Sequence, residues 1–183
     1  NGPKKVPGKI GQGLSFDRMD DYVHAGSASS LDGLGPMTIS AWVKPLSTGE
    51  GTAGAIVAKD GTGSGYWRFG YDGANNLEFS KEGSTFLAGT ATKPLAFGTW
   101  QHVLVTWDGS VNASEIHLYK DGVELVKSTS ANGVGLLSDS ALNVIIGNSS
   151  NAGQTWDGSI DDVRIYNRVL STDEIKRLYQ IGR

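Results

Sequence analysis

The chain of 183 residues contains no cysteine. This absence excludes disulfide bonds, thiolate nucleophiles and cysteine-ligated zinc. No apolar run approaches the ~20 residues that a helix needs to cross a bilayer, so we expect no membrane insertion. Basic residues are also sparse, because 16 Lys and Arg stand against 19 Asp and Glu and form no run longer than a pair. Nucleic acid binding needs a basic stripe, so that function is not expected either.

Glycine, in contrast, is abundant, with 26 residues that separate short segments of alternating apolar and polar character. This pattern is typical of β-strands joined by tight turns. Two packed antiparallel sheets suit this number of short strands, so the predicted class is an all-β sandwich. The segments that we expect to form strands are 15–16, 22–24, 38–44, 55–58, 67–71, 77–80, 101–107, 116–126 (as a hairpin) and 142–146.

Two segments carry more specific folding signals. Asp121-Gly122, between two apolar runs, supplies the positive φ angles of a type I′ turn and predicts the hairpin over 116–126. Near the C-terminus, Ser171 and Glu174 form a capping-box pair ahead of an amphipathic pattern. We therefore expect one short helix that closes the domain.

The domain organisation follows from composition and length. Residues 1–9 contain two prolines and three lysines, which predicts a linker or a frayed N-terminus. Residues 10–183 show no break in composition and suit a single domain. We expect this domain to be a monomeric module of a longer chain.

The segment Asp157–Tyr166 places acid where a strand should place hydrocarbon. Counting by twos from Val163 and Ile165 puts Asp161 on the same, core-facing side of the strand. Desolvation of an unpaired carboxylate costs several kcal/mol. Asp161 must therefore meet a cation, a metal ion or a set of hydrogen-bond donors.

A second acidic cluster, Asp17, Asp20 and Asp21, lies near the N-terminus. Its spacing excludes an EF-hand. If the two clusters converge, they form a site for a hard cation such as calcium, which prefers six to eight oxygen ligands. The expected charged ligands are Asp17, Asp161 and a neighbour such as Asp20 or Asp162.

The acidic clusters also have an interpretation without a metal. Backbone N–H groups can hold Asp161, while Arg164 or Arg168 pairs with Asp162. We favour the metal because an unpaired buried carboxylate is costly.

Six motifs occur in one order along the chain. They are Phe16-Asp17 with Asp20-Asp21-Tyr22-Val23, Met37–Pro45, Trp100-Gln101-His102-Val103, Leu118-Tyr119-Lys120-Asp121-Gly122, Asp157–Tyr166, and Leu170-Ser171 with Glu174-Ile175 and Leu178-Tyr179. Together they resemble the laminin-G-like, concanavalin-A-like jelly-roll family, in its form common in bacterial secreted proteins. The resemblance spans roughly residues 10–181 and implies a jelly roll at the cell surface or outside the cell. It also implies a structural calcium where the terminal strands meet, with Asp17 and Asp161 as its first ligands.

Catalytic patterns are missing. Glycosidases with similar jelly rolls carry a Glu-x-Asp-x-x-Glu array on one strand, which this chain lacks. Asp161 and Asp162 are adjacent and face opposite sides of a strand, so they cannot flank one glycosidic bond. A catalytic pair formed by carboxylates of two different strands stays an open alternative. His24, His102 and His117 lack the spacing of zinc ligands, and we expect His102 to be a satisfied, buried or half-buried histidine. We therefore expect no enzyme, but an accessory module of a carbohydrate-active enzyme fits.

Aromatic residues are the remaining candidates for binding. Sugar rings present C–H faces that pack on aromatic side chains, while amides and carboxylates pair with the hydroxyls. The alternative for each aromatic is packing in the core or against a loop. The candidate ligand-binding residues, beside a glycine-rich turn and in the loop 148–157, are Trp156, Trp67, Tyr66, Asn151 and Gln154.

The predicted function is non-catalytic carbohydrate binding by a module of a secreted or cell-surface multidomain protein with a structural calcium site. Its expected partner is a glycan or polysaccharide. The alternative is an adhesion or protein-interaction module that binds a cell-surface or extracellular protein. A glycan-active enzyme is the third interpretation, and it lacks a visible carboxylate pair.

Overall fold

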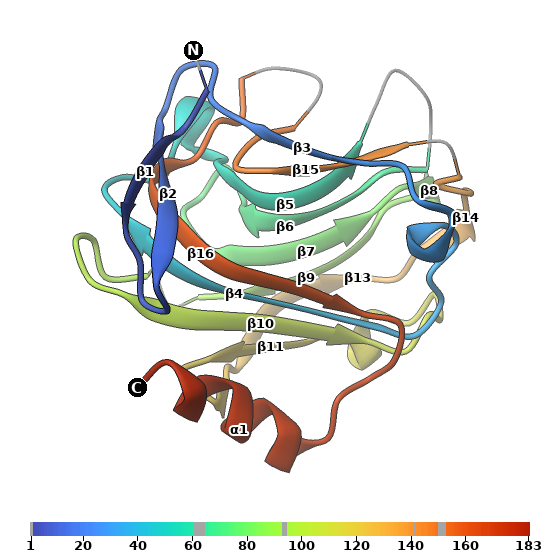
Figure 1. The fold of residues 1–183 in the computed structure, drawn as a ribbon. Coiled ribbons are helices and arrows are strands. Elements are labelled where there is room, and N and C mark those ends of the chain that lie inside the picture. Colours follow the sequence, from blue (N-terminus) through green and yellow to red (C-terminus); the bar gives the residue numbers. More distant parts are fainter. Residues whose placement is uncertain (1, 61–64, 93–94, 141, 150–152) are drawn as a thin grey trace.

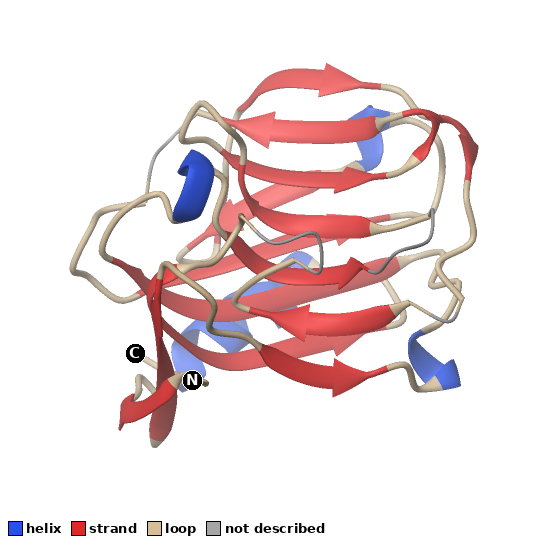
Figure 2. Ribbon diagram, turned by 90° about the horizontal axis from the view of Figure 1, so that it is seen from above, coloured by secondary structure: helices blue, strands red, loops and turns tan. Residues whose placement is uncertain are grey.

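Two antiparallel sheets pack face to face in the computed structural model, which describes residues 2–60, 65–92, 95–140, 142–149 and 153–183 (Figures 1 and 2). Within these ranges each sheet has seven strands. One sheet has α1 (Thr172–Ile181) against its outer face, and we call it the helix-covered sheet. Its strands, in spatial order, are β1 (Lys4–Pro7), β2 (Gln12–Asp17), β16 (Asp157–Tyr166), β4 (Met37–Pro45), β10 (Gln101–Trp107), β11 (His117–Lys120) and β12 (Val123–Glu124).

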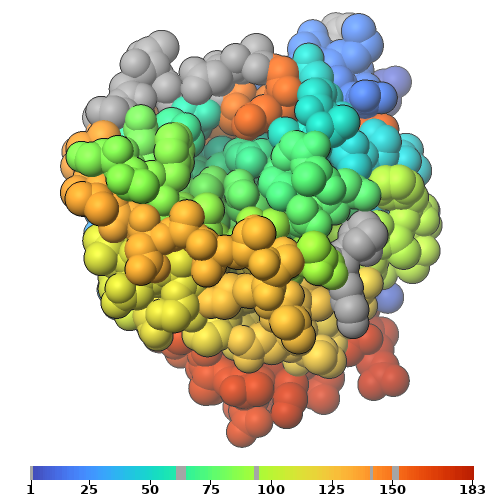
Figure 3. Space-filling model, turned by 180° about the vertical axis from the view of Figure 1, so that it is seen from behind, coloured from blue at the N-terminus to red at the C-terminus, as the bar shows by residue number. Residues whose placement is uncertain are grey.

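The second sheet, which we call the open sheet, turns its outer face toward solvent (Figure 3). A small pair of strands and three 3-10 helices lie in the connections between the strands of the two sheets. The strands of the open sheet are β13 (Lys127–Ala131), β9 (Leu87–Ala91), β7 (Leu77–Lys81), β6 (Trp67–Tyr71), β5 (Ala55–Asp60), β15 (Asn143–Ile146) and β3 (Val23–Gly26). The connecting elements are β8 (Gly83–Thr85), β14 (Val134–Leu136), η1 (Ser29–Leu31), η2 (Glu50–Thr52) and η3 (Ala113–Glu115).

The core lies between the inner faces of the two sheets. Trp67, Phe69 and Tyr71 alternate along β6 and are almost fully buried, as a strand with one face on the core requires. A smaller apolar cluster, which includes Leu104 of β10 and Ile175 of α1, lies between the helix and the helix-covered sheet. The predicted all-β, two-sheet antiparallel sandwich with one short C-terminal helix is confirmed.

The specific folding signals are confirmed as well. Asp121 and Gly122 both have positive φ angles, 52° and 77°, in the turn between β11 and β12. Ser171 and Glu174 form the capping box at the start of α1. Among the described residues, no helix is long and apolar enough to cross a membrane.

The N-terminal segment differs from the expectation of a frayed end. Lys4 to Pro7 form β1, which pairs antiparallel with β2 from Ser15 to Gln12. Pairing satisfies the backbone groups of this short strand, which an unpaired terminus would leave to water. Residues 4–7 are therefore part of the sandwich.

The segment Asp157–Tyr166 is a strand, but the count by twos along it fails. The register of β16 against β4 shifts between Asp161 and Arg164, and Asp162 has a φ of 47°. This bulge inserts one extra residue, so Val163 and Asp161 do not share a face. Asp161 lies opposite Trp42 on the outer side of the sheet, and the predicted core-facing position is wrong.

A buried ionic network links the inner side of the open sheet to the loop before β15. Lys59 of β5 and Lys81 of β7 lie 3.4 Å and 3.6 Å from the carboxylate of Asp139, and Lys59 also pairs with Asp32. Asp139 is fully buried and accepts a hydrogen bond from the indole of Trp67 at 3.1 Å. The network holds β5, β6 and β7 in register at one end of the sheet.

Candidate functional site

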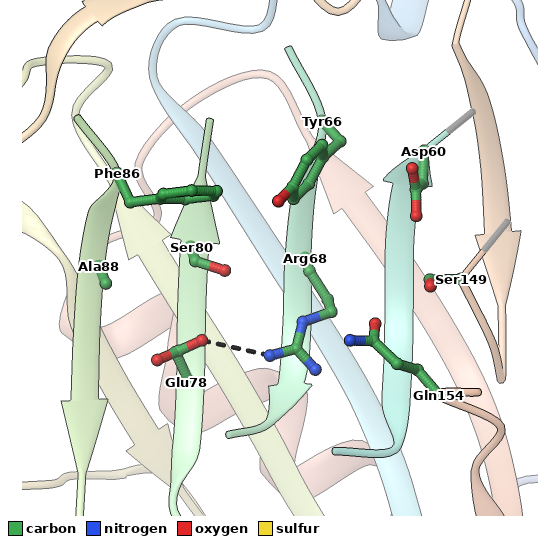
Figure 4. Close-up of a pocket in the computed structure, with 9 residues that line it drawn as sticks. All are labelled: Asp60, Tyr66, Arg68, Glu78, Ser80, Phe86, Ala88, Ser149 and Gln154. Atoms are coloured by element: carbon green, nitrogen blue, oxygen red, sulfur yellow. Dashed lines mark hydrogen bonds and ion pairs between the residues drawn. The ribbon is translucent and has the colours of Figure 1, made fainter. Parts of the chain in front are cut away.

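A cavity of about 310 Å³ opens on the outer face of the open sheet (Figures 3 and 4). Its walls combine aromatic, charged and amide side chains from β5, β6, β7 and β9, from the residues directly before β6 and β9, and from the loop before β16. The lining residues are Asp60, Tyr66, Arg68, Glu78, Ser80, Phe86, Ala88, Ser149 and Gln154.

The floor of the cavity follows from the strand register. Ala58, Arg68, Ser80 and Ala88 are paired successively across β5, β6, β7 and β9, so they form one row on the outer face. Three of these four side chains are small, which leaves space above the sheet. The guanidinium of Arg68 extends along this floor (Figure 4).

An aromatic pair forms one end of the cavity. The rings of Tyr66 and Phe86 lie 5.9 Å apart at 55°, and Phe86 is 47% exposed. Burial, followed by the negative charges of Glu82 and Asp60, raises the pKa of Tyr66. Its phenol is therefore neutral at physiological pH and can donate a hydrogen bond.

Arg68 is held in place by several acceptors. Its Nη1 donates to the carbonyl oxygens of Ala53 at 2.9 Å and Tyr71 at 2.8 Å, and its Nη2 donates to Glu78 at 3.2 Å. The second carboxylate oxygen of Glu78 accepts from the hydroxyl of Thr90 at 3.2 Å. These contacts fix both charged side chains before any ligand binds, which lowers the entropy lost on binding.

The predicted ligand-binding residues have different fates. Tyr66 and Gln154 both line the cavity, and their role as ligand contacts stays a prediction. Asn151 lies outside the described residues. Trp67 and Trp156 are only 1% and 0% exposed, so the expectation that they offer faces to a sugar is wrong.

The burial of the two tryptophans has a simple cause. Trp67 is in phase with the core residues of β6, and its indole binds Asp139. Trp156 stacks on the inward-facing ring of Tyr71, with 5.4 Å between centroids and 10° between planes. The alternative of core packing therefore holds for both residues.

Several cavity residues were missed in the sequence. Arg68, Glu78 and Ser80 interrupt the apolar sequence of β6 and β7 at every second position, between core residues. Polar residues at alternate positions mark the outer face of a half-buried strand. That pattern was visible, but it does not distinguish a binding face from ordinary solvated surface.

The acidic residues near the N-terminus do converge with one another. One carboxylate oxygen each of Asp17, Asp20 and Asp21 lies within 4.8 Å of the others. Asp21 is 4% exposed and accepts a hydrogen bond from the backbone N–H of Asp17 at 3.1 Å. Burial, followed by the charge of Asp17, raises the pKa of Asp21.

The C-terminal acids do not join this cluster. Asp17 pairs with Asp157 across β2 and β16, so Asp161 lies four residues further along, roughly 13 Å away. Asp161 accepts hydrogen bonds from the backbone N–H groups of Ile10 and Asp162, both at 2.7 Å. The predicted pairing of Asp17 with Asp161 as metal ligands is therefore wrong.

Asp162 is also occupied elsewhere. The Nε of Arg164 lies 3.0 Å from each of its carboxylate oxygens. Together with the backbone contacts of Asp161, this pairing matches the interpretation without a metal for both residues. Asp162 is therefore not a ligand of the N-terminal cluster.

The two carboxylates that line the cavity, Asp60 and Glu78, lie at different levels of the open sheet. Lys59 and Lys81 are both register partners of Trp67, so they lie at the same level of the sheet. Asp60 and Glu82 directly follow these two lysines and therefore also lie at one level. Glu78 lies four residues before Glu82 and two strands away from Asp60, which places the Cα atoms of Asp60 and Glu78 roughly 16 Å apart. Paired glycosidase carboxyl groups lie about 5 to 9.5 Å apart.

His102 is buried beneath α1, with 2% of its surface exposed. Its ring lies 5.3 Å from that of Trp42 and 6.3 Å from that of Tyr179. Its Nδ1 has no hydrogen-bond partner within the described residues, so the side chain is buried as expected but this ring nitrogen is not satisfied. These aromatic surroundings indicate a structural role.

We expect His102 to make stability depend on pH. Burial, with a smaller contribution from the positive charge of Arg164, lowers its pKa to about 4. An unfolded histidine has a pKa near ~6.5, so the unfolded chain binds the proton more tightly between these values. The contribution of His102 to the free energy of unfolding is fully present above pH ~6.5, and it falls by about 3 kcal/mol as the pH drops to ~4. Urea unfolding across this pH range should show that the free energy of unfolding falls less in His102→Gln than in the wild type. An equal fall in both proteins would contradict the assignment.

Comparison with known proteins identifies the family. The sequence model for Laminin_G_3, described as the concanavalin A-like lectin/glucanases superfamily, matches residues 17–176. The chain therefore belongs to this family, as the order of its motifs predicted.

Solved structures share the fold at low sequence identity. Domain 4 of AbnA, a GH43 extracellular arabinanase from Geobacillus stearothermophilus, in complex with arabinotriose, superposes with a TM-score of 0.74 and 21% identity over 97% of this chain and 81% of that one. The binding domain of Paraclostridial Mosquitocidal Protein 1 gives a TM-score of 0.71 and 16% identity over 98% of this chain and 45% of that one.

One curated relative is an adhesion protein. Adhesion G-protein coupled receptor V1 of Danio rerio is 27% identical over 156 residues. The match covers 80% of this chain but only 2% of the receptor, so it concerns one small part of that protein.

Proposed function

We propose that this domain is a non-catalytic carbohydrate-binding module that holds a glycan in the cavity of the open sheet. The observation that carries the proposal is the open cavity itself, with an aromatic pair at one end and fixed polar groups along its floor. A concave surface that combines apolar area with oriented polar groups is typical of ligand sites.

The groups in the cavity match the chemistry of a sugar. The rings of Tyr66 and Phe86 can pack against C–H faces, as aromatic surfaces do with apolar ligands. Glu78 can accept hydrogen bonds from hydroxyl groups, while the side chains of Arg68 and Gln154 can donate to sugar oxygens. The two carboxylates, Asp60 and Glu78, are too far apart for a glycosidase pair, which supports binding without hydrolysis.

The relatives support the same proposal. Domain 4 of AbnA, which shares this fold, was solved in complex with arabinotriose, and its parent enzyme is extracellular. We propose by analogy that this domain also works outside the cell or at the cell surface, as a monomeric module of a longer bacterial protein. Fold similarity alone does not determine the ligand, so the cavity carries the functional argument.

A glycan array tests the proposed function. We expect binding to one class of glycan that the same soluble glycan competes away. Absence of binding to every glycan on the array, combined with capture of one extracellular protein, would replace the proposal with an adhesion function. The similarity to an adhesion receptor favours this second candidate function, and the same experiment tests it.

We further propose a calcium ion at the acidic cluster formed by Asp17, Asp20 and Asp21. Calcium binds carboxylate oxygens, and three of them lie within 4.8 Å of one another. Burial first, and then the charges of Asp17 and Asp20, raise the pKa of Asp21, and a bound cation would relieve the repulsion among the three carboxylates. The residues present therefore fit a calcium ion without Asp161 or Asp162.

Thermal unfolding with and without a chelator tests this calcium site. Saturation at a hundredfold excess over Kd should stabilise the fold by about 2.7 kcal/mol. We expect Asp20→Asn to remove the effect of the chelator. As a matched control, Asp161→Asn should lower stability by about 1–3 kcal/mol through its backbone contacts and keep the full chelator effect. A chelator effect that disappears in Asp161→Asn instead would show that the wrong acids were assigned.

A further inference from the structure

We propose that the cavity of the open sheet selects uncharged glycans and rejects chains that carry carboxylate or sulfate groups. This inference rests on the proposed function and adds the class of ligand. It follows from the charges that line the cavity and from the way in which they are already paired.

Arg68 is the one cation among the described lining residues. Arginine frequently binds a carboxylate through two parallel N–H donors. Here Nη1 already donates to the carbonyl oxygens of Ala53 and Tyr71, and Nη2 already donates to Glu78. Both hydrogens of Nη1 and one of Nη2 are therefore used within the protein, and the positive charge of Arg68 is paired with Glu78. A ligand carboxylate would have only Nε and the second Nη2 hydrogen, and it would reach them in competition with Glu78.

The carboxylates outnumber this cation. Asp60 and Glu78 line the cavity with Arg68, so one positive and two negative charges give the lining a formal charge of −1. Glu82 lies at the level of Asp60 and Tyr66, and both acids raise the pKa of the Tyr66 phenol. An incoming anion would therefore meet a negative field at the aromatic end of the cavity.

The lysines beneath the sheet do not reverse this field. Lys59 and Lys81 are 0% and 5% exposed and lie on the inner side of β5 and β7. Both pair with Asp139, and Lys59 also pairs with Asp32, so two cations meet two anions. This buried network is neutral and contributes no net charge to the cavity.

An uncharged sugar meets complementary groups instead. Its hydroxyl groups can donate to the carboxylate of Glu78, and hydrogen bonds to a charged acceptor are stronger than those between neutral groups. A carboxylate on the sugar cannot donate, and it repels Glu78 at short range. We expect an acidic chain to bind at least tenfold more weakly than its neutral counterpart, about 1.4 kcal/mol.

A matched pair of ligands tests the inference. An acidic polysaccharide and its carboxyl-reduced form share one backbone, and only the first carries charge. We would compare several such pairs, including polygalacturonate and alginate, together with the neutral polymers arabinan, galactan and xylan, by affinity electrophoresis at 0.05 M and 1 M salt.

The outcomes separate the inference from the proposed function. Binding of a neutral form with at least tenfold weaker binding of its acidic form, and a smaller ratio at high salt, supports the inference. Equal or tighter binding of the acidic form overturns it and leaves carbohydrate binding intact. Absence of binding to every glycan overturns the proposed function, and the inference with it.

Charge-neutralising variants locate the effect. Glu78→Gln and Asp60→Asn each bring the formal charge of the lining from −1 to 0, and either one should narrow the ratio between neutral and acidic ligands severalfold. Glu124→Gln is the control, because Glu124 lies on β12 of the other sheet with its side chain 52% exposed. A ratio that stays constant in both cavity variants, with melting temperatures unchanged, would contradict the inference.

Discussion

Replacing Asp139 by asparagine is expected to lower the free energy of unfolding by about 3–5 kcal/mol, the typical loss when one partner of a buried ion pair is removed. Asp139 is fully buried and faces two lysines that have almost no contact with solvent. Asparagine preserves the shape of the side chain but leaves Lys59 and Lys81 without their shared counter-ion.

Other contacts of Asp139 add to this loss. One carboxylate oxygen accepts from the backbone N–H of Gly33 at 2.6 Å, and the other accepts from the indole of Trp67 at 3.1 Å. Burial already lowers the pKa of Lys81, while the charge of Asp139 opposes that shift. Lys81 should therefore lose its proton more readily in the variant, which softens the penalty at high pH.

Chemical unfolding in urea measures the effect. Glu124→Gln removes an exposed carboxylate and should change stability by less than about 0.5 kcal/mol. A loss below about 1 kcal/mol for Asp139→Asn at neutral pH would show that the network is not charged as we describe it.

The second large effect concerns binding. Ala88→Trp places a bulky ring on the floor of the cavity, where Ala88 faces outward between Ser80 and the edge strand β13. We expect at least a hundredfold loss of glycan affinity, about 2.7 kcal/mol. The fold should persist, because the side chain at this position points away from the core.

The same substitution elsewhere is the control. Val123 is 68% exposed on β12 of the helix-covered sheet, so Val123→Trp adds an equal ring far from the cavity. Isothermal titration with the glycan found on the array should show wild-type affinity for this control. Unchanged affinity in Ala88→Trp, with a normal melting temperature, would place the binding site elsewhere.

Much of the fold could be predicted because local patterns and tertiary structure agree. The Asp121-Gly122 turn and the Ser171–Glu174 capping box are local signals, and each depends on only a few neighbouring residues. The strands with clear alternation, such as β6 and β10, were also expected near their observed bounds.

The strands that sequence reasoning missed lack such alternation. β9 has the sequence Leu-Ala-Gly-Thr-Ala, and β13 reads Lys-Ser-Thr-Ser-Ala. Small residues serve the structure here, since a Cβ on Gly89 would lie 2.8 Å from Ile116, and Ala88 leaves space for the cavity. The polar strand β13 lies at the edge of the sheet, where burial is incomplete.

The binding site was only partly predictable. Tyr66 and Gln154 were found by their residue type and loop context, but the phase of Trp67 with Phe69 and Tyr71 already indicated the core. The bulge at Asp162 could not be anticipated, because its positive φ angle arises from pairing between strands distant in sequence. For the same reason, the separation of Asp17 from Asp161 required the sheet register.

The most direct test of the central claim is a crystal structure of the protein soaked with the glycan that the array identifies. The account predicts density for sugar rings above Ala88 and Ser80, with one ring against Tyr66 and hydroxyl groups within hydrogen-bond distance of Glu78 or Gln154. Density at the acidic cluster or along the edge of a sheet, with the cavity filled only by water, would contradict it.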